Sequence, residues 1–134
     1  AQIPPSLVEF RFELKGDPMK KAVTLKENYE FRRMYQRGKS AVSGSMVVYC
    51  RKNRLGHNRL GLTASTKLGH AVVRNRVRRR LREVYRLNED KFTSGWDIVV
   101  VARSKSVDAS FRDLTRAYLS LAKKAGILCA EEQK

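Results

Sequence analysis

The segment between residues 71 and 86, AVVRNRVRRRLREVYR, constrains the fold more than any other part of the chain. Its apolar residues recur at helical spacing and form one stripe, made of Val73, Val77, Leu81, Val84 and Tyr85. A stripe of this kind faces a protein core when the segment is helical. The spacing therefore predicts a helix over roughly residues 71–88 that is packed into a folded domain.

The same segment carries seven arginines and a single acid, Glu83. Arginines at i and i+4 on a helix repel each other by a few tenths of a kcal/mol per pair. Two such ladders are present, Arg74–Arg78–Arg82 and Arg76–Arg80. Because ordinary solvated helix faces mix charges of both signs, we interpret these arginines as a face that is neutralised by a partner outside the chain.

The composition indicates what kind of partner this is. The chain has 134 residues, 42% of them hydrophobic, which fits one folded domain. Its 29 lysines and arginines exceed 13 acids, so the formal net charge is +16. Nucleic acid is the leading candidate because the guanidinium fork suits phosphates and base edges. Its binding should depend strongly on salt, since phosphate contacts release counterions. No apolar run reaches the roughly 18 residues of a membrane span, so we expect no membrane partner.

The cysteines and histidines point to no chemistry of their own. Cys50 lies in an apolar run, and a disulfide with Cys129 has no support in the sequence. His57 and His70 have no metal-ligand partner at useful spacing, so we expect no metal held by the protein alone. The N-terminus lacks a basic start followed by an apolar stretch. We therefore expect a cytoplasmic protein in a reducing compartment.

Residues 1–18 differ from the rest, and we interpret them as an N-terminal extension to a single domain over residues 19–134. Their apolar residues alternate with charged ones over residues 8–14, which is typical of a strand with one apolar face. We hypothesise that this segment adds to a sheet edge or fills an apolar groove.

From Thr24 onward the sequence predicts the order helix, strand, strand, helix, strand, helix. Thr24 with Glu27 and Ser110 with Asp113 resemble capping boxes that open the first and last helices. The predicted helices are 24–37, 71–88 and 110–126, and the predicted strands are 45–51, 60–66 and 96–103, with a basic turn at 51–59. This order predicts an α+β sandwich, one sheet packed by helices.

Aromatic residues form a second feature. Phe31 and Tyr35 are four residues apart on the first predicted helix, and Tyr49 lies on the following strand. This spacing fits core packing, and it equally fits a platform on which unpaired bases stack. Basic residues surround these rings in the sequence: Arg32, Arg33, Arg37 and Lys39. Trp96, before the buried strand, is interpreted as a core residue.

The sequence holds no catalytic constellation. A protein nuclease needs clustered carboxylates for metal ions or a histidine pair for acid–base cleavage, and the acids here are scattered. We therefore interpret the chain as a binding module. Two alternatives stay open from the residues alone: a structural RNA-binding protein of ribosomal type, and a protein that places its helix in a DNA groove.

The residues around the arginine helix resemble the signature of the bacterial ribonuclease P protein subunit. The matching residues are Lys67, Gly69, Ala71, Val72, Arg74, Asn75, Arg76, Arg79, Arg82 and Glu83. The resemblance extends from about Met19 to Gly126. It implies a left-handed strand–helix–strand crossover that carries this motif, although general rules favour a right-handed one.

The resemblance also implies the site residues. The residues implied to bind the RNA subunit are Lys67, Arg74, Asn75, Arg76, Arg78, Arg79 and Arg82. Those implied to line a cleft for the 5′ leader of precursor tRNA are Phe31, Arg32, Tyr35, Lys39, Val47, Tyr49 and Ser65. Thr66 stands where the family often has a basic residue, and His70 where Asn is common, so the detailed leader contacts do not carry over there.

The activity implied by the resemblance belongs to a complex. In this family a large RNA holds the active site and most of the Mg²⁺, and the protein assists endonucleolytic removal of the leader. The implied partners are ribonuclease P RNA, in a 1:1 complex, and precursor tRNA, with no organic cofactor and no catalytic residue in this chain.

Overall fold

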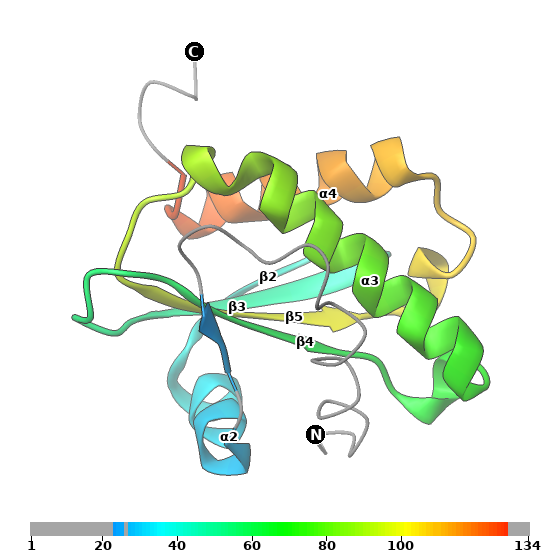
Figure 1. Cartoon of the computed structure of the whole chain (residues 1–134), viewed down its shortest axis with the longest axis horizontal. Helices are drawn as coiled ribbons and strands as arrows, with labels where there is room; N and C mark the ends of the chain where they lie inside the picture. The colour runs from blue at the N-terminus through cyan, green and yellow to red at the C-terminus, as the bar shows by residue number, and fades with distance from the viewer. Residues whose placement is uncertain (1–22, 26, 129–134) are drawn as a thin grey trace.

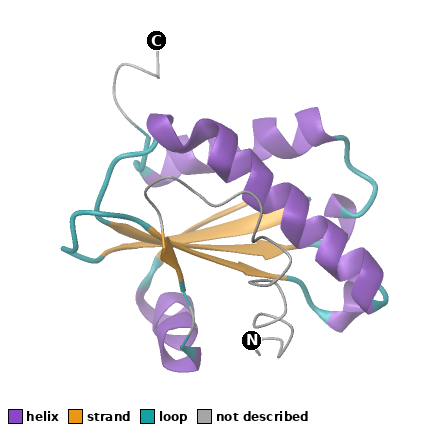
Figure 2. Ribbon diagram, viewed as in Figure 1, coloured by secondary structure: helices purple, strands orange, loops and turns teal. Residues whose placement is uncertain are grey.

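The fold is one five-stranded sheet with two helices on one face and one helix on the other (Figure 1). The computed structural model describes residues 23–25 and 27–128. The helices are α2 (Asn28–Arg37), α3 (Ala71–Asn88) and α4 (Phe111–Ala125). The strands are β1 (Val23–Thr24), β2 (Lys39–Val42), β3 (Met46–Lys52), β4 (Arg59–Thr63) and β5 (Trp96–Ala102). Figure 2 shows α3 and α4 together above the sheet and α2 below it.

The strands lie in the order β1-β4-β5-β3-β2. β3 is antiparallel to both β2 and β5, whereas β4 is parallel to β5 and to β1. Because parallel neighbours need a crossover connection, the chain leaves β4, passes through α3 and returns as β5. The α+β sandwich and the strand–helix–strand unit that carries the arginines are confirmed. The left hand of that crossover stays a prediction.

Most predicted elements are found within a few residues of their expected ends. The arginine helix spans Ala71–Asn88, as the spacing predicts, and β5 is buried on both faces over most of its length. The last helix has Ser110 as N-cap, whose Oγ accepts from the Asp113 N–H at 3.0 Å. It ends at Gly126, whose φ of 79° is the left-handed conformation that favours glycine.

The predicted start of the first helix is wrong. Thr24 belongs to β1, and the N–H of Leu25 donates to the Leu60 carbonyl at 2.9 Å, so this backbone is used by the sheet. The helix begins at Asn28, and the capping box is formed by Glu27 with Glu30. The edge strands β1 and β2 were not predicted, because two and four residues are too few to show alternation.

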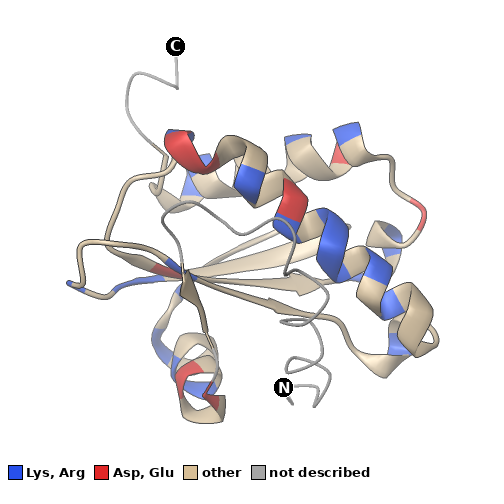
Figure 3. Ribbon diagram, in the orientation of Figure 1, with Lys and Arg blue, Asp and Glu red and all other residues tan. Residues whose placement is uncertain are grey.

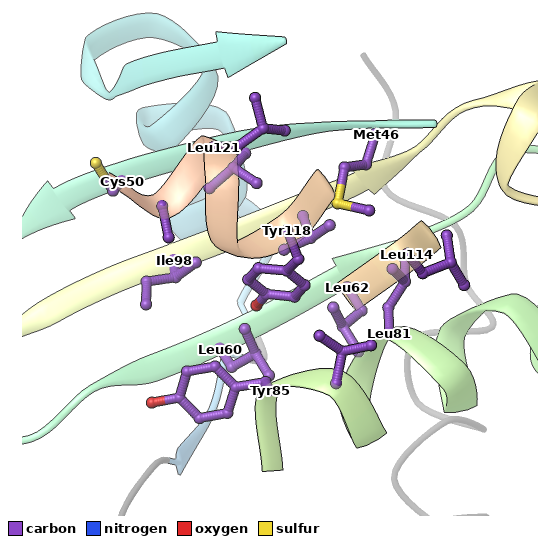
Figure 4. Close-up of a cluster of buried hydrophobic side chains, with 14 of the residues drawn as sticks. Met46, Cys50, Leu60, Leu62, Leu81, Tyr85, Ile98, Leu114, Tyr118 and Leu121 are labelled. Carbon is purple, nitrogen blue, oxygen red and sulfur yellow. The ribbon is translucent and has the colours of Figure 1, made fainter. Parts of the chain in front are cut away.

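The main core lies between the sheet and the helices α3 and α4 (Figure 4). Tyr85 and Tyr118 reach into it from the two helices, and the Phe92 ring lies between theirs, with centroids 4.8 and 5.9 Å away. Cys50 is a buried thiol in this core, and Trp96 packs against it, as expected. The proposed strand over residues 8–14, the extension over residues 1–18 and Cys129 lie outside the described residues.

A smaller core lies under α2. It contains Leu25, Phe31, Met34 and Val99. The Phe31 ring lies directly on the backbone of Gly61 in β4, and a Cβ at Gly61 would be 2.6 Å from that ring. The absent side chain therefore sets how closely α2 approaches the sheet.

Replacing Gly61 tests this contact. We expect Gly61→Ala to lower the free energy of unfolding by about 1–3 kcal/mol, because the new methyl group overlaps a fully buried ring. Gly44→Ala is the matched control, since its Cβ would meet only the flexible end of Lys105, and it should change the free energy by less than about 0.5 kcal/mol. Equal urea midpoints for the two variants would contradict this packing.

Candidate nucleic-acid interface

Helix α3 presents an arginine-rich face to solvent next to η1, a short helix over Thr66–Leu68 (Figure 3). Arg76 and Arg79 are exposed, and Arg74 and Asn75 are half-buried. Lys67 is exposed in η1. The first turn of α3 carries no acid, and the His70 side chain does not cap it. The exposed guanidinium groups thus lie in the first half of α3, beyond a first turn whose backbone N–H groups favour anions such as phosphate.

Two of the arginines predicted to contact RNA are buried instead. Arg78 is 0% exposed and Arg82 is 4% exposed. They lie beside the apolar stripe, one position beyond Val77 and Leu81, where a long aliphatic stem can pack and count as part of the core. The Arg78 guanidinium donates to the Asn75 side-chain oxygen. The expectation that these two guanidinium groups face a partner is therefore corrected.

Two other arginines on α3 hold the segment before α4. Arg80 donates to the Ala109 carbonyl at 2.7 Å, and Arg76 to the Val107 carbonyl at 3.4 Å. The single acid of the helix, Glu83, pairs with Arg86, and this hydrogen-bonded contact lowers the pKa of its carboxyl. Arg78 and Arg82 are thus buried, and Arg76 and Arg80 hold the segment before α4. Arg76 is also exposed, as is Arg79.

The opposite face of the sheet carries the aromatic site, a surface that α2 covers only in part. Tyr35 from α2 and Tyr49 from β3 meet edge to face, with ring centroids 5.1 Å apart. Val47 shares the face with Tyr49 by the alternation of β3, and the register places Val101 beside Val47. All four side chains are half-buried. We call these four residues the cleft.

Burial raises the pKa of the Tyr35 hydroxyl, and a hydrogen bond with Thr63 opposes this shift. Arg32 is exposed one turn before Tyr35, and Ser65 is exposed two residues beyond Thr63. The cleft therefore combines two aromatic rings and apolar side chains with a basic residue nearby. Such a surface can stack unpaired bases while a cation attracts their phosphates.

Two residues expected in the cleft are elsewhere. The Phe31 side chain of α2 is 0% exposed. Its ring packs between the helix and Gly61 of the sheet, so it offers no face to a base. Lys39 is paired with Cys50 across β2 and β3, and directly opposed residues share a face. Since Cys50 belongs to the core under α3 and α4, Lys39 lies on that side, away from Tyr49. The spacing of Phe31 and Lys39 in the sequence does not show on which side of the sheet, or how deeply buried, their side chains lie.

An ionic cluster that the sequence did not reveal anchors α2 beside the cleft. Arg59 holds Asp97 through two hydrogen bonds of 2.8 and 2.6 Å, and it also pairs with Glu30 of α2. Asn53 donates to Asp97 at 2.8 Å. These partners raise the pKa of the Arg59 guanidinium, chiefly through the hydrogen bonds with Asp97. Asp97 is thus an ion-pair partner, and its only sequence signal is an acid at the start of an apolar strand.

Neither a metal cluster nor a membrane span is found in the part of the chain that the structure describes. Within residues 23–25 and 27–128, no group of three or more His, Cys, Asp or Glu could hold a metal ion. None of the described helices is both long and apolar enough to cross a membrane.

Comparisons with known proteins agree on one family. The family model described as Ribonuclease P matches residues 19–126. The ribonuclease P protein component of Clostridium botulinum (strain Loch Maree / Type A3) is 47% identical over 104 residues, which are 77% of this chain and 94% of that protein. The RNase P protein of Staphylococcus aureus superposes with a TM-score of 0.74 at 33% identity, over 81% of this chain and 100% of that one. The RNase P protein from Thermotoga maritima gives a TM-score of 0.70 at 32% identity, over 75% and 96%.

The buried and exposed arginines should respond differently to substitution. We expect Arg76→Ala to weaken binding of a structured RNA at 0.15 M salt by about fivefold, with the free energy of unfolding within ~0.5 kcal/mol of the parent. Arg78→Ala should lower that free energy by roughly 2–4 kcal/mol, because it removes a buried stem and strands Asn75. Urea unfolding and filter binding measure both effects. An equal loss of unfolding free energy in the two variants would contradict the prediction, because exposed Arg76 would then contribute as much to stability as buried Arg78.

Proposed function

The chain belongs to the ribonuclease P protein family, and we propose that its two faces divide the binding work, with α3 on the RNA subunit and the cleft on the 5′ leader. As a family member it is a subunit of the endoribonuclease that processes the 5′ end of tRNA, in which catalysis resides in the RNA. Its partners are accordingly ribonuclease P RNA and the tRNA substrate. Family membership favours this role over the structural RNA-binding and DNA-binding alternatives.

The observation that carries the α3 assignment is the separation of its arginines into buried and exposed groups. Arg76 and Arg79 are exposed in the first half of α3, which carries no acid, and Lys67 is exposed in η1, which contacts α3. Half-buried Arg74 and Asn75 complete a surface on which guanidinium forks and helix N–H groups can meet phosphates together. Phosphate contacts of this kind position the protein and carry little sequence information.

The cleft is suited to a single strand. A duplex hides its bases, whereas an unpaired leader exposes the faces of successive bases to Tyr35, Tyr49 and the valines. Stacking tolerates any base, which fits a substrate whose leader varies from one tRNA to another. The clamp of Arg59 with Asp97 and Glu30 fixes the start of α2, so Tyr35 is held in place before the leader binds.

The Mg²⁺ of the reaction belongs with the RNA in this proposal. Mg²⁺ takes oxygen ligands at nearly octahedral geometry, which phosphates and water supply, and the described residues offer no acidic cluster for it. The protein contributes positive charge near the same phosphates, which should lower the Mg²⁺ concentration that the complex needs. We further propose a 1:1 complex with the RNA, located in the cytoplasm.

Reconstitution tests the function. We expect the protein with a bacterial ribonuclease P RNA to cleave 5′-labelled precursor tRNA at the mature 5′ end at low Mg²⁺, where neither component acts alone. Cleavage assays with and without each component measure this. Tight RNA binding with no gain in cleavage would instead favour a structural RNA-binding protein.

The leader assignment has its own test. We expect Tyr49→Ala to weaken the affinity of the complex for a long-leader precursor by about five- to tenfold, since stacking is worth roughly 1–3 kcal/mol per base. The affinity for leaderless tRNA should not change. Tyr29→Ala is the matched control, because Tyr29 is 56% exposed on α2 and lies outside the cleft. Equal losses for both substrates would remove Tyr49 from the leader site.

A further inference from the structure

The outer side of α4 carries three cations that the function proposed above does not use. Arg112, Arg116 and Lys123 are exposed, and at about 3.6 residues per turn they lie within about 40° of one another around the helix axis. Asp113, the only acid of α4, is turned toward the β2–β3 turn, where it lines a shallow depression. We call Arg112, Arg116 and Lys123 the α4 basic face.

The stability of the helix does not explain the two arginines of this face. Arg112 and Arg116 are four residues apart, a spacing at which like charges repel. Arg112 also lies in the first turn, where the helix dipole disfavours a cation. Neither arginine pairs with an acid among the described residues. An anionic partner would offset both unfavourable interactions.

The α4 basic face adjoins the arginines of α3. The two helices lie side by side on the same face of the sheet (Figure 1). Arg76 donates to the Val107 carbonyl and Arg80 to the Ala109 carbonyl, so both guanidinium groups lie beside the segment that leads into α4. Arg112 follows that segment within the first turn of α4. We call Arg76, Arg80 and the α4 basic face together the two-helix surface.

Acidic groups do not neutralise the two-helix surface. Glu83 is the only acid of α3, and its carboxyl is already paired with Arg86. The acids nearest to the start of α4 are Asp108 and Asp113, and both line the depression beside the β2–β3 turn together with Lys105. Five cations from two helices therefore share one surface whose single acid is occupied.

This surface is suited to a phosphate backbone. Guanidinium groups bind phosphate oxygens through paired hydrogen bonds. The aromatic residues of the two helices, Tyr85, Phe111 and Tyr118, pack on the main core, so they offer no ring on which an unpaired base could stack. Double-stranded RNA hides its bases and is bound mainly through phosphates and 2′-hydroxyl groups. The rise of about 17 Å from Arg112 to Lys123 is long enough to follow several phosphates of a duplex.

We propose that the α4 basic face binds the phosphate backbone of a double-stranded segment of the RNA subunit, next to the RNA bound by α3. This inference rests on the proposed function of α3. The RNA subunit is the partner because Arg76 belongs both to the two-helix surface and to the α3 surface proposed to bind that RNA. The cleft proposed for the leader lies on the opposite face of the sheet. Contacts of this kind add affinity and little sequence preference.

A double variant provides the first test, with filter binding of a bacterial ribonuclease P RNA at several salt concentrations. We expect Arg112→Gln with Arg116→Gln to weaken binding about tenfold at 0.15 M salt. The slope of log affinity against log salt should fall by about 1.8, because two phosphate contacts are lost. The urea midpoint should not change, since both side chains are exposed.

The matched control removes the same charge from the other side of α4. Lys105 lines the depression beside the β2–β3 turn, and Lys124 lies two turns from Ala117, which lines it too. We expect Lys105→Gln with Lys124→Gln to weaken binding less than about twofold and to leave the salt slope nearly unchanged. Equal losses in the two double variants would show that only net charge matters, and would overturn the proposal.

Three further probes test the chemistry and the source of the partner. We expect Arg112→Gln with Arg116→Gln to weaken binding of a 20-base-pair RNA duplex and to leave binding of a 20-residue oligouridine unchanged. Equal losses for these two RNAs would contradict the assignment to a duplex. Loss of binding to phosphatidylglycerol vesicles with unchanged affinity for RNA would instead identify a lipid surface. A lower affinity of the assembled complex for leaderless tRNA, with unchanged affinity of the protein for the RNA subunit, would overturn the choice of RNA.

Cleavage separates this inference from the proposed function. At a saturating concentration of protein, the complex with Arg112→Gln and Arg116→Gln should cleave precursor tRNA at the parental rate, because α4 contributes affinity for the RNA subunit. A parent protein that binds the RNA with the expected salt slope and supports no cleavage counts against the proposed function alone. Normal cleavage by the parent, with the same affinity and salt slope in the variant, counts against this inference alone.

Discussion

The Arg59 guanidinium, held between Asp97 and Glu30, ties together three parts of the chain that are far apart in sequence. Arg59 begins β4, Asp97 lies in β5, and Glu30 belongs to the first turn of α2. The half-buried guanidinium of Arg59 therefore holds together β4, β5 and the first turn of α2. The Phe31 ring can then lie on Gly61, and Tyr35 comes to lie beside Tyr49. The geometry of the cleft depends on this ionic contact at the start of two inner strands of the sheet.

The sheet separates two kinds of recognition. Its α3 and α4 face is filled by a continuous core, so on that side the outer faces of the helices are what a partner could contact. Its other face is covered by a single ten-residue helix, and the uncovered strand residues form a recognition surface themselves. In the function proposed above, the exposed arginines of α3 contact a large folded RNA and the cleft contacts a flexible strand.

The sequence predicted the elements that have a long period and strong end signals, because those properties are local. The 18 residues of α3 and the Ser110 cap of α4 are of this kind. Side-chain placement depends on what packs alongside, which the spacing does not contain. Phe31 is buried because Gly61 opposes it, and Lys39 leaves the cleft because of its pairing with Cys50. Arg78 is buried with its guanidinium on the Asn75 side chain, although its charge marks it as a surface residue.

Arg76 donates a hydrogen bond of 3.4 Å to the Val107 carbonyl, and the same guanidinium belongs to the surface proposed to bind RNA. A hydrogen bond of that length is weak, so a phosphate that binds the guanidinium can replace the carbonyl with a small loss of free energy. Of the two hydrogen bonds that α3 donates to the segment ahead of α4, the one from Arg80 then remains. By thermodynamic reciprocity, whatever stiffens that segment lowers the affinity of Arg76 for phosphate, and whatever loosens it raises that affinity. Phosphate binding at Arg76 and loss of its hydrogen bond to the Val107 carbonyl would therefore be coupled.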